Sequence, residues 1–413
     1  MLQVKLIRPI HPFPARMASE IVWDELAGRR PSRVLDPMAG SGTTVMAAKL
    51  RGHEAIGYDR DPLAVLIARS WVAEMTPAQI ERKAADVMNT AWTLASRMRA
   101  ADAYPRAANE ETREFVRYWF DATNRKHLAA LSTAIARVRS PAIRDILWCA
   151  FSRLIITKQS GVSLAMDVSH SRPHKAYDKA PWIALRRFED AVRQVVKACP
   201  FAAGDETPPA RVELADARSL PLPDENVDLV ITSPPYLNAI DYIRGHKFSL
   251  IWMGHTLDNL RTLRSSNVGT EVGARATEND DQTNQIIQRM CDIDTVSPRH
   301  LGMLRRYVHD MRQVLSETRR VLRPGGKAVF VVGNCNLRSA FVENSKCIEA
   351  LGAELGMSCM TSRTRLLPDD RRYLPPPQCL GAGTRLKKRM REEVIITLGK
   401  VRNPSVDHRQ SFG

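Results

Sequence analysis

The sequence predicts an α/β protein, in which helices cover both faces of a mainly parallel sheet and a large helical insertion interrupts the sheet. Three observations support this class. Short apolar strands alternate with helical stretches near both ends of the chain. A turn of small residues, Pro37–Thr43, follows the first strand, and the stretch 76–204 is rich in Ala and Arg with few strand signals.

The composition indicates a globular protein with a polyanionic partner. The chain has 413 residues, 44% of them hydrophobic, and a formal net charge of +16. A charge of this sign and size favours nucleic acid as the partner. No apolar stretch is long enough to cross a bilayer, and charges interrupt the N-terminus before a signal-peptide core forms. The seven cysteines include no Cys-x-x-Cys pair, which predicts a cytoplasmic protein without a disulfide framework or structural metal site.

Residues 1–75 form the first predicted part of the sheet domain. Arg33–Asp36 reads as a strand, the turn follows it, and Thr44–Arg51 has helical composition. Glu54–Tyr58 reads as the second strand, after which an apolar helix extends to about Ser70. A strand, a turn, a helix and a second strand in this order predict parallel pairing.

Residues 76–204 form the predicted helical, basic insertion, a candidate target-recognition region. Between 81 and 200 there are 21 Lys and Arg against 12 Asp and Glu, a net charge of +9. More than half of the excess charge therefore lies here. Lys158–Lys175 is less helical than its surroundings and combines hydroxyl groups with cations.

Residues 205–400 form the predicted second part of the sheet domain, and 401–413 a flexible tail. Expected strands are 211–214, 227–232, 327–332, 359–366 and 393–398. A helix is expected near 300–321, and the turn Arg323–Gly326 is expected to precede the strand at 327.

The small-residue turn has the character of a ligand-binding loop. Its glycines would let a ligand approach the backbone, and the following helix offers free N–H groups. Val45 stands where a dinucleotide fingerprint needs a third glycine, which weakens an NAD interpretation. Asp36, Asp59 and Asp216 each end a predicted strand, where open α/β sheets bind ligands. An ordinary tight turn is the alternative for the loop alone.

Ser233-Pro-Pro-Tyr236 follows an apolar strand directly. Consecutive prolines stiffen the loop and lack N–H donors, so it presents acceptors to a partner such as an amino group. Ser233 adds a hydroxyl, and Tyr236 offers a flat face on which a base can stack. A simple proline turn is the competing interpretation.

The combination of Asp36-Pro-Met-Ala-Gly-Ser-Gly-Thr43 with Thr232-Ser-Pro-Pro-Tyr236 resembles the S-adenosylmethionine-dependent DNA amino-methyltransferases, which methylate N4 of cytosine or N6 of adenine. The segments 11–17, 214–232 and 391–396 are similar to this family as well. The resemblance implies a Rossmann-like methyltransferase fold and S-adenosylmethionine as cofactor. The implied cofactor-binding residues are His11, Phe13, Asp36, Pro37, Ala39, Gly40, Ser41, Gly42, Thr43, Asp59, Asp216 and Ala217. The implied catalytic residues, which would hold the target base, are Ser233, Pro234, Pro235 and Tyr236.

The serine of this motif favours cytosine over adenine as the target. Family members that act on adenine-N6 usually have Asp or Asn at the position of Ser233, whereas Ser is usual in the cytosine-N4 group. The resemblance therefore predicts a site-specific DNA cytosine-N4 methyltransferase that extrudes its target base from the helix. An adenine-N6 enzyme is the nearest alternative, followed by an RNA methyltransferase and an inactive DNA-binding relative.

DNA is thus the predicted partner, and no membrane is expected. A place in restriction-modification is compatible with the resemblance, but the sequence identifies no restriction endonuclease partner. Cations and hydroxyl groups are the usual contacts to nucleic-acid phosphates. The candidate nucleic-acid-binding residues are Lys158, Ser169, His170, Arg172, His174, Lys175, Arg244 and Lys247. A solvated basic loop is the equally weighted alternative for those near 158–175.

Overall fold

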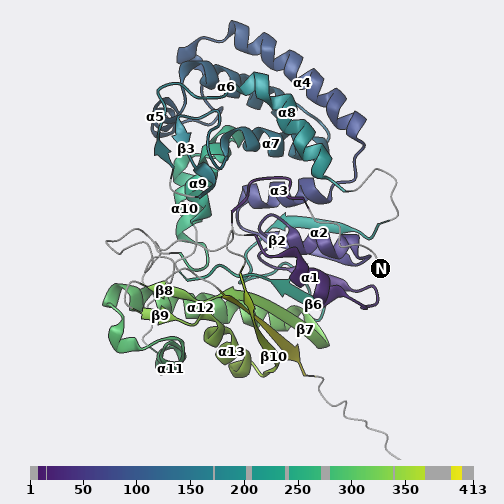
Figure 1. The fold of residues 1–413 in the computed structure, drawn as a ribbon, viewed down its shortest axis with the longest axis vertical. Helices are drawn as coiled ribbons and strands as arrows, with labels where there is room; N and C mark the ends of the chain where they lie inside the picture. The colour runs from purple at the N-terminus through teal and green to yellow at the C-terminus, as the bar shows by residue number, and fades with distance from the viewer. Residues whose placement is uncertain are drawn as a thin grey trace, which may run out of the picture. The chain divides into compact units, whose positions relative to one another are not determined.

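The computed structural model (Figure 1) describes residues 8–14, 16–170, 173–200, 207–237, 241–270, 280–337, 340–367 and 392–401. The chain forms two compact units. The first unit comprises Met1–Pro31, Asp36–Asp216 and Asn238–Arg275. The second unit comprises Ser32–Leu35, Ala217–Leu237 and Ala276–Gly413. Each unit is described by itself below.

In the first unit, two parallel strands support the segment that carries the small-residue turn. Strand β2 (Glu54–Asp59) pairs with β5 (Ala210–Leu214) in parallel. Helices α2 (Thr43–Leu50) and α3 (Pro62–Val72) pack on each other and on these strands, and α1 (Ser19–Leu26) packs on α2. Gly57 of β2 permits this packing, because a Cβ there would lie 2.7 Å from Cγ2 of Val45 in α2.

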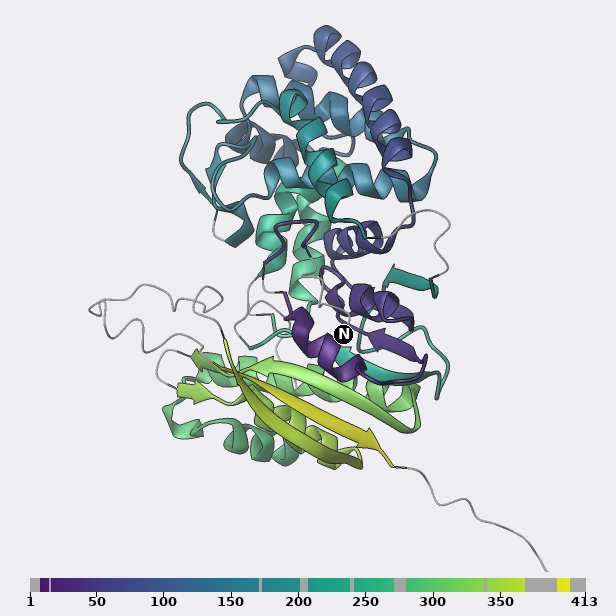
Figure 2. The ribbon, with the colours of Figure 1, turned by 45° about the vertical axis from the view of Figure 1, so that its right-hand side comes forward.

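The predicted helical character of 76–204 is confirmed. This stretch forms α4 (Pro77–Arg97), η1 (Ala100–Asp102), α5 (Glu110–Trp119), α6 (Ala122–Ala136), α7 (Pro141–Ile155), η2 (Val168–His170) and α8 (Ala184–Ala198). A small hairpin pairs β3 (Ala165–Met166) with β4 (His174–Lys175). Figures 1 and 2 show α4 outermost, with α6 and α8 beneath it and α7 next to α3. The helix starts are well specified; Thr76 and Gln79, for example, form a capping box on α4.

The first unit is completed by α9 (Tyr242–Leu250), η3 (Ile251–Met253) and α10 (Leu257–Ser265). Helix α9 contacts both α3 and α7. Its Phe248 is fully buried, with ring centroids 5.0 Å from those of both Phe115 and Trp119. Apolar burial of this kind fixes α9 against the insertion and against the helix that follows β2.

The second unit contains a mixed sheet in the order β10-β11-β7-β6-β1. Strand β6 is parallel to β1 and β7, whereas β11 is antiparallel to both β7 and β10. The strands are β1 (Arg33–Asp36), β6 (Val227–Thr232), β7 (Leu322–Gly333), β10 (Met357–Leu366) and β11 (Glu392–Lys400). The other elements are α11 (Asp281–Met290), η4 (Ile293–Thr295), α12 (Pro298–Val321), α13 (Asn344–Glu354), and the paired β8 (Cys335–Leu337) and β9 (Ala340–Val342).

One sequence expectation needs refinement in β7. The turn at 323–326 does not precede the strand but lies within it, because β7 already begins at Leu322. Val227 pairs with Leu322 and Leu229 with Lys327, so four residues of β7 bulge opposite Asp228. Gly325 has a φ of +80°, a conformation that glycine adopts without steric cost. The predicted Rossmann-like α/β fold with a large helical insertion is otherwise confirmed.

Candidate active site

The small-residue turn is held closed by its own backbone. The amide of Ala39 donates to the carbonyl of Tyr58 at 2.8 Å, and the amide of Gly42 donates to the carbonyl of Ala39 at 2.8 Å. Asp36 is buried and accepts from the amide of Met38 at 3.1 Å. Of the other predicted cofactor residues in this turn, all but the half-buried Gly40 are buried as well: Pro37, Ala39, Ser41, Gly42 and Thr43.

The two glycines of the turn have different reasons to be glycine. Gly42 has a φ of +89°, and a Cβ there would lie 2.7 Å from Cβ of Ala68 in α3. It therefore serves the close approach of α3, a packing role that the sequence did not reveal. Gly40 has a φ of +50°, and a Cβ there would face the ring of Phe13 at 3.6 Å. A Cβ at Gly40 would make only an ordinary van der Waals contact, so the positive φ is the reason for glycine at this position.

Three carboxylates gather at the turn. Asp59 accepts from the amide of Gly40 through Oδ2 at 2.8 Å and from the amide of Asp61 through Oδ1 at 2.9 Å. Burial raises the pKa of Asp59 to about 7; the charges of Asp61 and Asp36 add to this, whereas the two backbone hydrogen bonds oppose it. A cationic ligand with hydroxyl groups would relieve this repulsion and donate to Asp59.

Asp216, the third strand-end acid of the sequence, is ion-paired. Arg60 Nη1 lies 2.7 Å from Asp216 Oδ2. The same guanidinium donates to Ser266, to the carbonyl at 3.0 Å and to Oγ at 2.7 Å. Arg60 therefore ties the end of β5 to the end of α10. Ala217, the neighbouring predicted residue, belongs to the second unit and is buried.

The N-terminal segment brings His11 and Phe13 into the first unit. His11 is buried, its Nε2 lies 3.0 Å from Ser152 Oγ, and burial holds its pKa well below the ordinary value. The Phe13 ring stacks on Tyr242 of α9 at 5.4 Å and an interplanar angle of 18°. Phe13 therefore lines the turn from one side and holds α9 from the other.

Helix α9 contributes residues next to the turn that no motif in the sequence predicts. His246 is buried, its ring centroid lies 5.2 Å from that of Phe13, and its Nδ1 is hydrogen-bonded to Asp61. Asp61 also caps α3 by accepting from the amide of Leu63 at 2.9 Å. The Asp-Pro step at 61–62 is a visible helix-start signal. No sequence pattern links Asp61 to a histidine so far along the chain.

The catalytic motif predicted from the sequence lies at the end of β6 in the second unit. Ser233 Oγ donates to the carbonyl of Val331 at 2.9 Å and lies 3.5 Å from the hydroxyl of Tyr236. Pro234 is buried, whereas Ser233, Pro235 and Tyr236 are half-buried. Because Ser233 donates its hydroxyl proton to the Val331 carbonyl, the lone pairs of Oγ remain to accept a hydrogen bond from a ligand.

The predicted nucleic-acid contacts differ in their exposure to solvent. Lys158 and His174 are exposed, and Lys175 is exposed with Nζ 5.0 Å from the ring centroid of Tyr118. Ser169 is buried, a placement that does not favour a phosphate contact. The side chain of His170 and all of Arg172 lie outside the described residues.

The two predicted contacts on α9 are less exposed. Arg244 pairs with Asp241 at 3.5 Å. Lys247 is half-buried, with Nζ 5.0 Å from the ring centroid of Phe115, and burial lowers its pKa.

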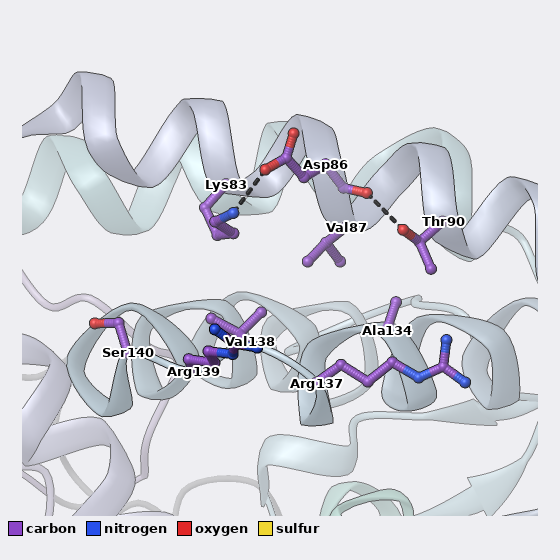
Figure 3. Close-up of a pocket in the computed structure, with 9 residues that line it drawn as sticks. All are labelled: Lys83, Asp86, Val87, Thr90, Ala134, Arg137, Val138, Arg139 and Ser140. Carbon is purple, nitrogen blue, oxygen red and sulfur yellow. Dashed lines mark hydrogen bonds and ion pairs between the residues drawn. The ribbon is translucent and has the colours of Figure 1, made fainter.

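A hollow in the insertion gathers further cations (Figure 3). It lies between α4 and the α6–α7 connection, where Val87 of α4 stands opposite Ala134 and Val138, and Lys83, Arg137 and Arg139 also line it. Lys83 pairs with Asp86 at 2.7 Å, while Arg137 and Arg139 are exposed and have no ion-pair partner among the described residues. The hollow therefore carries a net positive charge.

The fold and the carboxylates at the turn define a class: an α/β protein whose first unit gathers Asp36, Asp59 and Asp61 beside a glycine turn, an arrangement suited to a ligand with positive charge and hydroxyl groups. Among the described residues, no helix is both long and apolar enough to cross a membrane.

Comparisons with known proteins make the class more specific. A family model described as DNA methylase matches residues 10–70, which include the turn, Asp59 and Asp61. The type II methyltransferase M.MvaI of Kocuria varians is 20% identical over 392 residues, covering 89% of this chain and 85% of the relative. The type II methyltransferase M.BsoBI of Geobacillus stearothermophilus is 21% identical over 389 residues, covering 81% of this chain and 74% of the relative.

A solved structure of an S-adenosylmethionine-dependent methyltransferase from Methanosarcina mazei covers 94% of this chain and 100% of its own at 9% identity. The TM-score of this match is 0.33. The family model and the two relatives confirm the predicted resemblance to the DNA amino-methyltransferases, whose cofactor is S-adenosylmethionine.

Proposed function

We propose that this protein is a DNA methyltransferase that transfers a methyl group from S-adenosylmethionine to the exocyclic N4 of cytosine. The DNA methylase match and the two type II methyltransferase relatives support transfer to an amino group of DNA. The choice of cytosine rests on Ser233. The observation that carries the proposal is the hydrogen bond of 2.9 Å from Ser233 Oγ to the carbonyl of Val331, which turns the hydroxyl into an acceptor.

The acids of the first unit are assigned to the cofactor. Asp59 would accept from the ribose hydroxyls, because its two oxygens are already oriented by the amides of Gly40 and Asp61. Asp216 would accept from the adenine amino group, and Asp36, with the turn from Pro37 to Thr43, would bind the methionine part. His11, Phe13, Ala39 and Ala217 would complete its surroundings. When bound, S-adenosylmethionine supplies an activated methyl group on a sulfonium.

The residues at the end of β6 are assigned to the target base. The amino nitrogen of cytosine is a poor nucleophile, because its lone pair is delocalised into the ring. Ser233 Oγ and the carbonyl of Pro234 would accept its two hydrogens, which favours a pyramidal nitrogen and stabilises the positive charge that develops there. Pro235 stiffens the loop, and Tyr236 would stack on the extruded base, offsetting part of the cost of leaving the helix.

The insertion is assigned to the DNA backbone. Exposed Lys158, His174 and Lys175 stand on and near the β3–β4 hairpin, and Arg137 and Arg139 stand at the hollow of Figure 3. Cations of this kind supply sequence-independent affinity by neutralising phosphates. Arg244 and Lys247 of α9 remain proposed contacts to the target strand.

The test is transfer of a labelled methyl group to DNA, followed by digestion and nucleoside analysis. N4-methylcytosine is the expected product. N6-methyladenine would move the activity to the adenine group of the same family, while label in RNA only, or in neither, would overturn the proposal. Sequencing of DNA from cells that express the chain then gives the sequence context of the modified base.

A further inference from the structure

His246 of α9 is buried next to the cofactor turn, and its placement calls for an explanation. Only 1% of its surface is exposed, and its Nδ1 is hydrogen-bonded to Asp61 Oδ2. Its Nε2 is also buried and has no hydrogen-bond partner among the described residues. An unpaired buried nitrogen is costly, and a leucine or phenylalanine would fill the same space without that cost. The hydrogen bond to Asp61 is therefore what the imidazole provides.

Asp61 is one link in a series of hydrogen bonds that leads to the cofactor turn. Its amide donates to Asp59 Oδ1 at 2.9 Å, and Asp59 Oδ2 accepts from the amide of Gly40 at 2.8 Å. A shift of Asp61 would thus move the carboxylate to which the ribose is assigned. Asp61 also caps α3, whose approach to the turn requires Gly42.

The aromatic wall of the turn depends on His246 as well. The ring centroid of Phe13 lies 5.2 Å from that of His246, and the ring edge of Phe13 lies next to Gly40. Tyr242, one helical turn before His246, stacks on the same phenylalanine. His246 therefore contacts the cofactor surroundings twice, once through a carboxylate and once through a ring.

We propose that His246 is a positioning residue of the cofactor site, which holds Asp61, and through it Asp59, in the orientation that binds the ribose. This inference rests on the proposed function, because it takes Asp59 as the ribose acceptor. The donor at Nδ1 is the feature that matters, and the second ring nitrogen has no part in it.

Substitution of His246 by asparagine or glutamine tests the roles of Nδ1 and Nε2 separately. In His246→Asn the amide nitrogen stands near the position of Nδ1 and can still donate to Asp61, whereas in His246→Gln the amide lies nearer the position of Nε2. His246→Leu removes both. The control is His127→Leu on α6, whose half-buried ring packs on Trp92 at 5.7 Å, away from the turn.

Binding of S-adenosylhomocysteine is measured by calorimetry on the full chain, together with thermal unfolding of the ligand-free variants. We expect His246→Gln and His246→Leu to weaken binding about tenfold, the cost of losing a hydrogen bond to a charged group, while His246→Asn stays within about threefold. His127→Leu should bind like the wild type.

Equal affinity for the Asn and Gln variants would overturn the inference, since a purely structural histidine would not distinguish them; this comparison also holds if His246→Leu fails to fold. Unchanged binding in all three variants would overturn it too. A wild-type chain that binds no S-adenosylhomocysteine would instead refute the proposed function.

Discussion

Arg60 and Asp216 form an ion pair of 2.7 Å between Nη1 and Oδ2, although Asp216 is the acid assigned to the adenine of the cofactor. Both side chains are about 30% exposed or less, so the pair is only partly desolvated. Arg60 also donates to Ser266 at the end of α10. The acceptor for the adenine is thus oriented by a cation that also holds α10.

This arrangement predicts the effect of removing the acid. Asp216→Ala should weaken binding of S-adenosylhomocysteine about tenfold, because a charge-assisted hydrogen bond to the adenine amino group is lost. Isothermal calorimetry measures the change. Asp178→Ala, which removes an exposed acid of the insertion, is the matched control and should leave the affinity unchanged. An Asp216→Ala protein that binds as tightly as the control would contradict the assignment.

The raised pKa of Asp59 predicts that cofactor binding depends on pH. Burial, then Asp61 and Asp36, raise this pKa to about 7 from an ordinary value of about 3.9. In the ligand-free protein, the stability contributed by the neutral form is present below about pH 4 and is lost as the pH rises through 7. The ribose hydroxyls need the ionised form as acceptor, so affinity should rise with pH and level off above about 7.

Calorimetry of S-adenosylhomocysteine binding between about pH 5.5 and 8.5 tests whether the affinity rises with pH. Binding should release protons only below about pH 7. An affinity that falls with rising pH would show that Asp59 binds in its protonated form.

Two glycines with similar positive φ, Gly42 at the turn and Gly52 after α2, give a test of the packing at the turn. Gly42→Ala introduces both a strained φ of +89° and a Cβ 2.7 Å from Ala68. Gly52→Ala introduces a similar φ of +81° with no atom within 4 Å. The strained φ costs about 1–2 kcal/mol in both variants, and overpacking adds about 1–3 kcal/mol in the first. Urea unfolding should therefore show Gly42→Ala as the less stable variant. Equal losses of unfolding free energy in the two variants would mean that α3 shifts to accommodate the added methyl group.

Much of the fold was predictable because strand and helix signals are local. The sequence predicts β1 at 33–36 and β6 at 227–232 with the bounds that the structure has, and α12 within two residues. Apolar runs and helix caps act within a few residues of chain, so they can be recognised without the tertiary structure.

The candidate site was predictable only where its motifs are contiguous. The glycine turn and Ser233–Tyr236 are runs of neighbouring residues, whereas His246 lies 185 positions from Asp61 and Arg60 lies 156 positions from Asp216. Such pairs arise from packing of α9 and from strand pairing, and neither leaves a pattern in the sequence. For the same reason the sequence predicts a ligand role for Gly42 but gives no sign of the close packing against Ala68 that also requires glycine there.

The hydroxyl of Ser233 gives the most direct prediction on catalysis. Ser233→Ala should lower turnover about a hundredfold, the usual cost of losing one preorganised group at a developing charge. Affinity for S-adenosylhomocysteine should change less than twofold, since the cofactor is assigned to other residues. Ser362→Ala, an exposed serine on β10, is the control for both measurements. Equal losses in turnover and cofactor affinity would show that Ser233 does not act at the reacting nitrogen.

The cations at the hollow of the insertion predict a change in the salt dependence of DNA binding. If Arg137 and Arg139 each neutralise a phosphate, the double variant Arg137→Gln/Arg139→Gln should lower the slope of log K against log salt by about 2. Arg299→Gln/Arg319→Gln removes two exposed arginines of α12 and the same net charge, so it controls for the overall field. Both variants are compared with the wild type by fluorescence anisotropy on one duplex at several salt concentrations. A slope that drops equally in the two variants would trace the affinity to net charge, and an unchanged slope in the insertion variant would remove the hollow from the DNA-binding surface.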